Sequence, residues 1–269
     1  TGMPQAHVRY DRVEVAEGEP ISAERLSALA VLEQIPGLFV RQKAQWLEEL
    51  TGFEKRNKYQ IKVKPPYVDA ANRDAQIKEL PMLWKAKEKS DCCPRVCCAP
   101  SHGWEMKIED AAGQEVLRYQ RPFKCTILCP PCLLWAQEVS AVLPDGALLG
   151  KVVQNFKCCS FSHWFNVFSD TGTLIYELKV PCCQFGPNCI CERFIIHILR
   201  AGTEEQVGTI ENTWPGCTFR ALLSKADNLE ITFDQPIAAQ HKAILLGAVF
   251  LIDYLYFEKR TQRDDDMDV

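Results

Sequence analysis

Residues 243–257, AILLGAVFLIDYLYF, constrain the fold of this chain more than any other feature. Fourteen of these residues are apolar, and only Asp253 interrupts them. A helix that crosses the hydrocarbon core of a bilayer needs about 20 apolar residues, so this run is short and also carries a carboxylate. A helix that is apolar on all sides can instead be buried inside protein. We therefore predict an enclosed central helix over 243–257. Its key positions are Leu246, Gly247, Phe250, Asp253 and Tyr254.

Much of the remaining chain is predicted to form β-hairpins. Residues 104–117 alternate apolar and polar side chains around an Asp-Ala-Ala-Gly turn, and residues 164–175 do so around Asp-Thr-Gly. The ranges 138–153 and 194–210 are further candidates. Alternating runs joined by turns with glycine are typical of antiparallel hairpins, and a long antiparallel meander tends to close into a barrel. The pattern predicts a mainly β protein, a barrel with a helix threaded through it.

The N-terminal part of the chain differs from the rest. Residues 1–21 are largely polar and are predicted to form an extended arm. From Ser22 the apolar positions keep a helical period until Pro36 and Gly37. A second apolar run over 38–50 ends at Thr51-Gly52. We therefore expect N-terminal helical or mixed structure up to Gly52 and strands beyond it.

Composition excludes some classes of function. The chain has 269 residues, a net charge of −4 and a hydrophobic content of 47%, enough for one domain with a large core. It has no Lys/Arg-rich stripe with interleaved aromatic residues, so no nucleic-acid partner is expected. The nearest approach is residues 85–89, which we interpret as a solvated loop. The first residues lack the pattern of a secretory signal, so we expect a protein that is not secreted.

The chain contains fourteen cysteines, many of them in adjacent pairs. Vicinal cysteines bridge poorly, so we interpret them as reduced thiols in a cytosol-like compartment. Two alternatives stay open, which are metal ligation and S-acylation. The thiol cluster consists of Cys92, Cys93, Cys97 and Cys98. It could hold zinc or an iron–sulfur cluster, but no second CxxC or His-x3-5-His stands at the usual distance, which disfavours zinc.

Four groups of residues, taken in chain order, resemble the phospholipid scramblase family. They are Thr51-Gly52-Phe53-Glu54 with Asn57-Lys58-Tyr59; Asp91-Cys92-Cys93-x3-Cys97-Cys98-x-Pro100; Arg121-Pro122-x2-Cys125; and Ala226-Asp227-Asn228 leading to Lys242-Ala243 and Phe250-Leu251-Ile252-Asp253. The match runs over about 36–258 and is more specific than any one motif.

The resemblance implies a Tubby-like fold, a closed antiparallel β-barrel of about twelve strands around a hydrophobic C-terminal helix. The barrel domain would span 36–260, after an N-terminal arm and helix over 1–35 and before an acidic tail over 261–269. The resemblance also implies a membrane-associated protein linked to calcium-dependent, ATP-independent movement of phospholipids between leaflets. Family members are often palmitoylated on cysteine, and some act in the nucleus or mitochondria.

The family's calcium loop is altered in this chain. Lys225 and Pro236 stand where the first and last carboxylates are expected, and Glu230 replaces a glycine. Calcium needs six to eight oxygen ligands, so these changes weaken the site. Apolar and polar residues alternate over 229–234, which favours a half-buried strand with an acidic outer face. The remaining candidates for weak calcium binding are Asp227, Asn228, Glu230 and Asp234.

Three other regions compare with family features. The palmitoylated cluster aligns with the lipidation candidates Cys125, Cys129 and Cys132, and two thioesters would suffice for stable anchoring. The nuclear-import segment falls on 208–216, which has no Lys or Arg. An insertion over 63–90 either binds a protein partner or covers the barrel rim.

Two hypotheses about function follow. No hydrolytic or transfer motif surrounds Ser162-His163 or Asp170, so we expect no enzyme, and lipid translocation at most. The first hypothesis is a scramblase-like protein with a phospholipid membrane as its partner. The second is a non-catalytic subunit of a larger, mitochondrial membrane assembly that reuses the barrel. Either would lie on the cytosolic or matrix side of the plasma membrane or a mitochondrial membrane.

Overall fold

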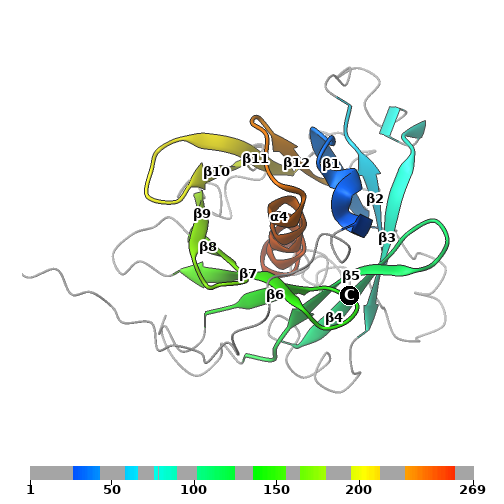
Figure 1. The fold of residues 1–269 in the computed structure, drawn as a ribbon, viewed down its shortest axis with the longest axis horizontal. Coiled ribbons are helices and arrows are strands. Elements are labelled where there is room, and N and C mark those ends of the chain that lie inside the picture. The colour runs from blue at the N-terminus through cyan, green and yellow to red at the C-terminus, as the bar shows by residue number, and fades with distance from the viewer. Residues whose placement is uncertain are drawn as a thin grey trace, which may run out of the picture.

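A computed structural model describes residues 27–42, 58–65, 76–77, 79–89, 102–124, 136–155, 164–179, 195–212 and 228–257. Twelve strands form a closed barrel around one long helix (Figure 1). The strands are β1 (Gly37–Gln42), β2 (Lys58–Val63), β3 (Met82–Lys89), β4 (Trp104–Glu109), β5 (Glu115–Arg121), β6 (Glu138–Val142), β7 (Leu148–Asn155), β8 (Trp164–Ser169), β9 (Leu174–Lys179), β10 (Ile195–Arg200), β11 (Gln206–Asn212) and β12 (Asn228–Phe233).

The strands follow one another around the barrel in chain order, and β12 closes it by pairing antiparallel with β1. Alternation within each strand decides which side chains face inward. In β4, for example, Trp104, Met106 and Ile108 are buried, whereas the residues between them are only partly covered. The turn to β5 is the predicted one: Gly113 has a φ of 81°, and the Asp110 carboxylate accepts backbone N–H bonds. The predicted antiparallel barrel is confirmed.

The helix α4 (Ala239–Ile252) runs through the barrel and continues as a π-helical turn, η6 (Asp253–Phe257). The side chains of Leu246 and Phe250 are 0% exposed and that of Tyr254 is 1% exposed. These three lie on one face of the helix, and Leu245, Leu251 and Ile252 on its other sides are 0% exposed as well. The predicted enclosed helix is confirmed, and it begins four residues earlier than the apolar run. The extra turn is possible because the barrel accommodates Lys242, a charged residue that the sequence pattern placed outside the helix.

The N-terminal part is mixed in the described residues, as expected, but the predicted extent of its helix is wrong. The only helix there is the six-residue 3-10 helix η1 (Ser27–Leu32), and Gly37–Gln42 is the strand β1. The run Leu38-Phe39-Val40 is fully apolar because both faces of β1 are covered. A strand buried on both sides lacks alternation, so its sequence cannot be distinguished from a buried helix segment.

The interpretation of residues 85–89 as a solvated loop is also wrong. They belong to the strand β3, which pairs with β2 and β4. Within the 63–90 insertion, Ile77 is buried, and its carbonyl oxygen accepts a hydrogen bond from the Lys62 ammonium at 2.9 Å. Part of the insertion therefore contacts the outside of the barrel, and another part supplies one of its strands.

Two buried polar contacts fix the start of α4. The Lys242 ammonium donates to the carbonyl oxygens of Leu32, Glu33 and Ile35 at 2.9, 3.0 and 2.8 Å, at the end of η1. Burial lowers the pKa of Lys242. The Tyr119 hydroxyl donates to the Ala243 carbonyl oxygen at 2.6 Å. Carbonyl groups thus replace the water that the ammonium loses, and the helix is held against both η1 and β5.

The wall lies close against α4 at Gly247. A Cβ atom added there would lie 2.9 Å from Cε1 of Tyr119, which is shorter than real Cβ contacts. The Tyr119 ring is held by its hydroxyl bond to Ala243 and lies 5.4 Å from the Phe250 ring, so it has little freedom to move away. Glycine is therefore required at this position of the helix.

We expect Gly247→Leu to lower the free energy of unfolding by about 1–3 kcal/mol, because the new side chain overpacks against Tyr119. Denaturant titration of the two proteins measures the difference. In a Tyr119→Ala background the same substitution should cost less, because the ring is gone. Equal costs in the two backgrounds would show that Tyr119 is not the obstacle.

Candidate functional site

The inward positions of the strands change from apolar to polar at the end of the barrel where α4 finishes. We call these residues, together with Asp253 and Tyr254 from η6, the polar end cluster. Its other members are Tyr59 from β2, Glu88 from β3, His102 ahead of β4, Arg121 from β5 and Gln137 ahead of β6. All seven side chains are buried. Strand ends from separate hairpins meet here because antiparallel neighbours bring alternate ends to one rim.

Tyr254 is the centre of the cluster. Its hydroxyl donates to Oε2 of Glu88 at 2.6 Å, and its ring stacks on Trp104 with the centroids 4.8 Å apart. The Arg121 guanidinium lies over the Tyr254 ring, with its central carbon 5.9 Å from the ring centroid. Nε2 of His102 lies 3.6 Å from Oε1 of Glu88. The Tyr254 side chain is thus surrounded by the Glu88 carboxylate, the Arg121 guanidinium and the rings of Trp104 and His102.

A second pair of contacts lies beside it. The Tyr59 hydroxyl donates to Oδ2 of Asp253 at 2.6 Å, and the Tyr59 ring meets Phe250 edge to face at 5.2 Å. Arg121 donates to Oε1 of Gln137 from Nη2 at 2.6 Å and from Nε at 3.2 Å. Both carboxylates of the cluster therefore accept a short bond from a tyrosine hydroxyl, which stabilises their ionised forms.

The electrostatics of this end are unfavourable without those partners. The C-terminal end of a helix carries a partial negative charge, so the carboxylate of Asp253 is repelled there. The Glu88 carboxylate adds a second negative charge nearby, offset by the Arg121 guanidinium and the tyrosine hydroxyls. The arrangement holds the end of α4 through charge-assisted bonds, whereas the middle of the helix is held by apolar packing alone. These bonds can hold the C-terminal end of α4 inside the barrel, and breaking them would free it.

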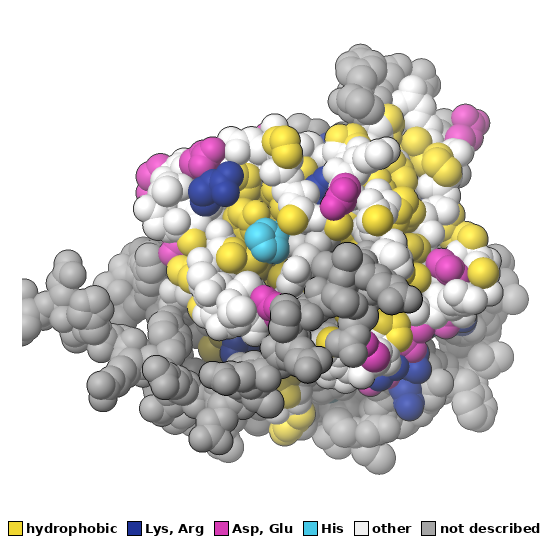
Figure 2. All heavy atoms as spheres, in the orientation of Figure 1, with side chains coloured by type: hydrophobic (Ala, Val, Ile, Leu, Met, Phe, Trp, Pro, Cys, Tyr) yellow, Lys and Arg dark blue, Asp and Glu magenta, His cyan; other side chains and the backbone are white. Residues whose placement is uncertain are grey.

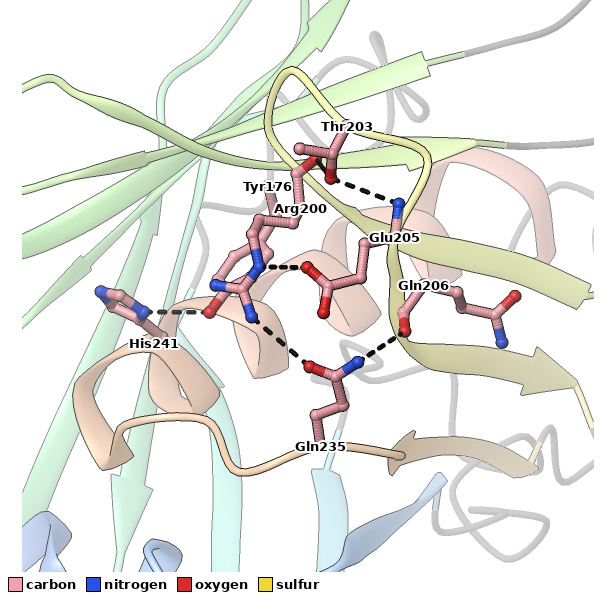
Figure 3. A network of polar contacts seen from close by, with 7 residues as sticks. All are labelled: Tyr176, Arg200, Thr203, Glu205, Gln206, Gln235 and His241. Atoms are coloured by element: carbon pink, nitrogen blue, oxygen red, sulfur yellow. Dashed lines mark hydrogen bonds and ion pairs between the residues drawn. The ribbon is translucent and has the colours of Figure 1, made fainter.

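The opposite rim carries a different network, shown in Figure 3. The Tyr176 hydroxyl lies 3.1 Å from Nδ1 of His241, in the first turn of α4. Arg200 pairs with Glu205 at 2.7 Å and donates to Gln235 at 3.4 Å. Burial lowers the pKa of His241. The space-filling view in the same orientation as Figure 1 shows hydrophobic side chains between scattered charged groups (Figure 2).

The calcium candidates lie in or beside β12. Glu230 is 2% exposed and its Oε1 lies 3.5 Å from the Lys64 ammonium. Oδ2 of Asp234 accepts a bond from Nε2 of Gln206 at 3.3 Å. Asn228 begins the strand, and Asp227 lies outside the described residues. In the described parts of the chain, no three His, Cys, Asp or Glu side chains gather as a metal site would require.

The cysteine candidates lie outside the described residues. These are the lipidation candidates Cys125, Cys129 and Cys132, and the thiol cluster Cys92, Cys93, Cys97 and Cys98. All fourteen cysteines belong to five connections: β3–β4, β5–β6, β7–β8, β9–β10 and β11–β12. Each of these connections leaves an odd-numbered strand and enters an even-numbered one. The flanking strand ends therefore all lie on the rim of the polar end cluster.

Asp253 and Tyr254 were predicted from the sequence, but their contacts within the cluster were not. A detectable signal existed for Glu88, which follows the inward positions Trp84 and Ala86 at a spacing of two. A carboxylate at an apolar phase of a strand indicates a buried partner. Arg121 has the same relation to Leu117 and Tyr119. His102 and Gln137 precede their strands, so no alternation marks them.

Known proteins resemble this chain over most of its length. A family model described as Scramblase matches residues 17–259. Phospholipid scramblase 1 of Homo sapiens is 33% identical over 231 residues, which are 86% of this chain and 65% of that protein. Phospholipid scramblase 2 of Bos taurus is 34% identical over 230 residues, 86% of this chain and 71% of that protein.

A more distant relative, phospholipid scramblase family member 5 of Homo sapiens, is 27% identical over 231 residues, 86% of this chain and 77% of that protein. The chain spans less than two thirds of phospholipid scramblase 1, with 65% of the human and 62% of the Rattus norvegicus protein covered. No solved structure matches the chain. Among the described residues, no helix combines the length and apolar character needed to cross a bilayer.

We expect Tyr254→Phe to lower the free energy of unfolding by about 1–3 kcal/mol, because it leaves the buried Glu88 carboxylate without its shortest donor. Tyr176→Phe is the matched control at the opposite rim. Its hydroxyl faces a neutral histidine in a half-buried setting, so a smaller loss is expected. Denaturant titration measures both, and a larger loss for the control would contradict the importance of the polar end cluster.

Proposed function

Because this chain belongs to the scramblase family, we propose that it is a membrane-associated protein that moves phospholipids between the leaflets of a bilayer. The observation that carries this proposal is the family match over residues 17–259, together with relatives named phospholipid scramblases at about one third identity. The twelve-stranded barrel around α4 supports it, because the matched range contains the whole barrel. The alternative, a structural subunit of a larger assembly, gains no support from these relatives.

The filled barrel limits how lipids could move. The interior is occupied by α4, whose residues from Ala243 to Ile252 are buried without interruption. The described residues around this part of α4 leave no surface for a polar headgroup, and a headgroup in hydrocarbon needs polar partners. Lipid movement therefore requires the barrel to open, the helix to leave it, or several chains to act together. The polar end cluster is where such a release would begin, because its contacts depend on charge.

The proposed activity needs no covalent chemistry. Moving a phospholipid between leaflets makes and breaks no bond, so it requires no nucleophile or general base. Asp170, which the sequence offered as part of a catalytic set, accepts a bond from the backbone N–H of Thr171 in the β8–β9 turn. The residues Ser162 and His163 lie outside the described residues. We infer lipid translocation at the cytosolic or matrix face of the plasma membrane or a mitochondrion.

We expect the reconstituted protein to speed the exchange of a fluorescent phospholipid between the leaflets of liposomes. Chemical quenching of the outer leaflet measures the exchanged fraction against protein-free liposomes of the same composition. Exchange equal to that of the protein-free liposomes, with and without calcium, would contradict the proposal. A faster exchange in Tyr254→Phe than in Tyr176→Phe would indicate that release of the helix end limits the rate.

Calcium provides a second arm of the same experiment. We propose that binding through Asp227, Asn228, Glu230 and Asp234 is at best millimolar. Lys225 and Pro236 supply no carboxylate, and Glu230 already faces the Lys64 ammonium. Micromolar calcium should leave the exchange rate unchanged. Calorimetry that found micromolar binding, lost in Asp227→Ala, would overturn this part of the proposal.

We further propose that Cys129 and Cys132 attach the protein to the membrane as thioesters, with Cys125 as a third candidate. A single acyl chain binds a membrane only marginally, so two are needed for stable anchoring. The double substitution Cys129→Ser and Cys132→Ser should move the protein from the membrane fraction to the soluble fraction of cells. Cys158→Ser with Cys159→Ser is the matched control and should stay membrane-bound. An unchanged distribution of the first variant would assign anchoring to other contacts.

A further inference from the structure

A row of cations crosses the outer face of four neighbouring strands. Lys58 of β2 lies directly opposite Lys87 of β3, and Lys87 lies opposite Lys107 of β4. Lys107 in turn lies opposite Arg118 of β5. Neighbouring strands are about 4.8 Å apart, so the row spans roughly 14 Å. We call these four residues the cation row.

The pleat of β3 makes this surface more basic than its sequence indicates. The sequence Lys85-Ala86-Lys87-Glu88-Lys89 indicates that Glu88 offsets part of the positive charge of the adjacent lysines. Successive side chains of a strand point to opposite faces, so Glu88 lies inside the barrel against Tyr254. The three lysines are exposed on the outside, and the side chain of Lys87 is 54% exposed.

The charge on this face is unbalanced. The exposed or half-buried outward cations of β2 to β5 are Lys58, Lys85, Lys87, Lys89, Lys107 and Arg118, and the outward carboxylates are Glu105, Glu109 and Glu115. Six cations against three carboxylates leave an excess of three positive charges. By the same criterion the other eight strands together carry four cations, Arg41, Lys151, Lys179 and Arg200, and three carboxylates, Glu138, Glu177 and Glu211, because Glu230 is buried. The excess is therefore concentrated on one side of the barrel, three positive charges against one on the other eight strands, in a chain whose net charge is −4.

The cation row acts against the stability of the barrel. Like charges directly opposite one another on adjacent strands repel, and the row contains three such pairs in succession. Three flanking carboxylates reduce the repulsion. Lys87 pairs with Glu109 at 2.6 Å, Lys107 with Glu115 at 3.3 Å, and Arg118 with Glu115 at 2.6 Å and Glu105 at 3.8 Å. These carboxylates are too few to cancel the repulsion. An external anionic surface would neutralise the row, because its charges could face all four cations together.

We propose that the outer face of β2 to β5 docks onto the anionic headgroups of a phospholipid membrane. The charge is complementary to such a surface, and cations near it add to binding independently of sequence. The proposal rests on the membrane association proposed above. It further specifies that the β2 to β5 side of the barrel contacts the lipid, and that negatively charged headgroups are preferred. Within the described residues, no other group of strands offers a comparable excess of positive charge.

The test compares two pairs of substitutions that change the net charge equally. Lys87→Gln with Lys107→Gln removes the centre of the cation row. Lys151→Gln with Lys179→Gln removes two outward lysines of β7 and β9 and is the matched control. Each full-length protein is mixed with preformed vesicles of phosphatidylcholine containing about 30% phosphatidylserine, and with vesicles of phosphatidylcholine alone. Sedimentation measures the bound fraction, and thermal unfolding checks that each variant is folded.

We expect binding to the anionic vesicles to fall about 25-fold for the cation-row pair, roughly fivefold for each lysine, and less than about fivefold for the control pair. Wild-type binding should weaken when salt is raised, because exposed charges are screened. The unfolding midpoint of the cation-row pair should stay the same or rise, since like charges have been removed.

Equal losses for the two pairs, or equal binding of the wild type to both kinds of vesicle, would overturn the proposal. Binding of the wild type to polyglutamate that depends on the cation row, without binding to anionic vesicles, would assign the face to an acidic protein instead. Binding as expected without lipid exchange in the reconstituted assay would contradict the proposed transport activity but leave the docking face standing. The two proposals therefore fail independently.

Discussion

The helix α4 presents apolar side chains in every direction, and the remaining structure follows from the need to cover all of them. A helix of this kind cannot lie on one face of an open sheet, because its far side would be left in water. A closed barrel removes that problem and at the same time leaves no sheet edge exposed. Closure needs β1 to pair with β12, which joins the N-terminal part of the described chain to the strand that leads into the helix. The barrel and its helix must therefore form together.

The two ends of α4 carry charges that oppose the helix dipole. Lys242 lies in the first turn, where a cation is disfavoured, and Asp253 follows the last residue, where an anion is disfavoured. An isolated peptide with this sequence would gain nothing from either. The barrel supplies what the helix lacks, namely three carbonyl groups from the end of η1 for Lys242 and the Tyr59 hydroxyl for Asp253. The charges thereby fix the direction and depth of the helix, which apolar packing alone would leave open to sliding.

Much of this architecture could be predicted from the sequence, and the failures have a common physical cause. The central helix and the hairpin at Asp110 to Gly113 follow from local patterns, and the number of strands followed from the family resemblance. The strand β1 was missed because Phe39 is covered from outside by other parts of the protein, so its two faces are equally apolar. The strand β3 was missed because its run of charged residues was interpreted as a solvated loop. That interpretation does not consider that alternate residues of a strand face opposite sides of the sheet. Only the pleat separates Glu88 from the lysines beside it.

The same separation distinguishes the two sides of the barrel wall. Inside, side chains of the wall match α4 closely. Tyr119 packs against Gly247, and the Glu88 carboxylate accepts a hydrogen bond from the Tyr254 hydroxyl. Outside, the cation row has more positive charges than flanking carboxylates, and its mutual repulsion would be relieved by an added anionic surface. A barrel whose interior is full must meet lipids first with its exterior. In the proposed docking, charge on that exterior sets the side from which a membrane is approached, and the hydrogen bonds of the polar end cluster keep the end of the helix enclosed.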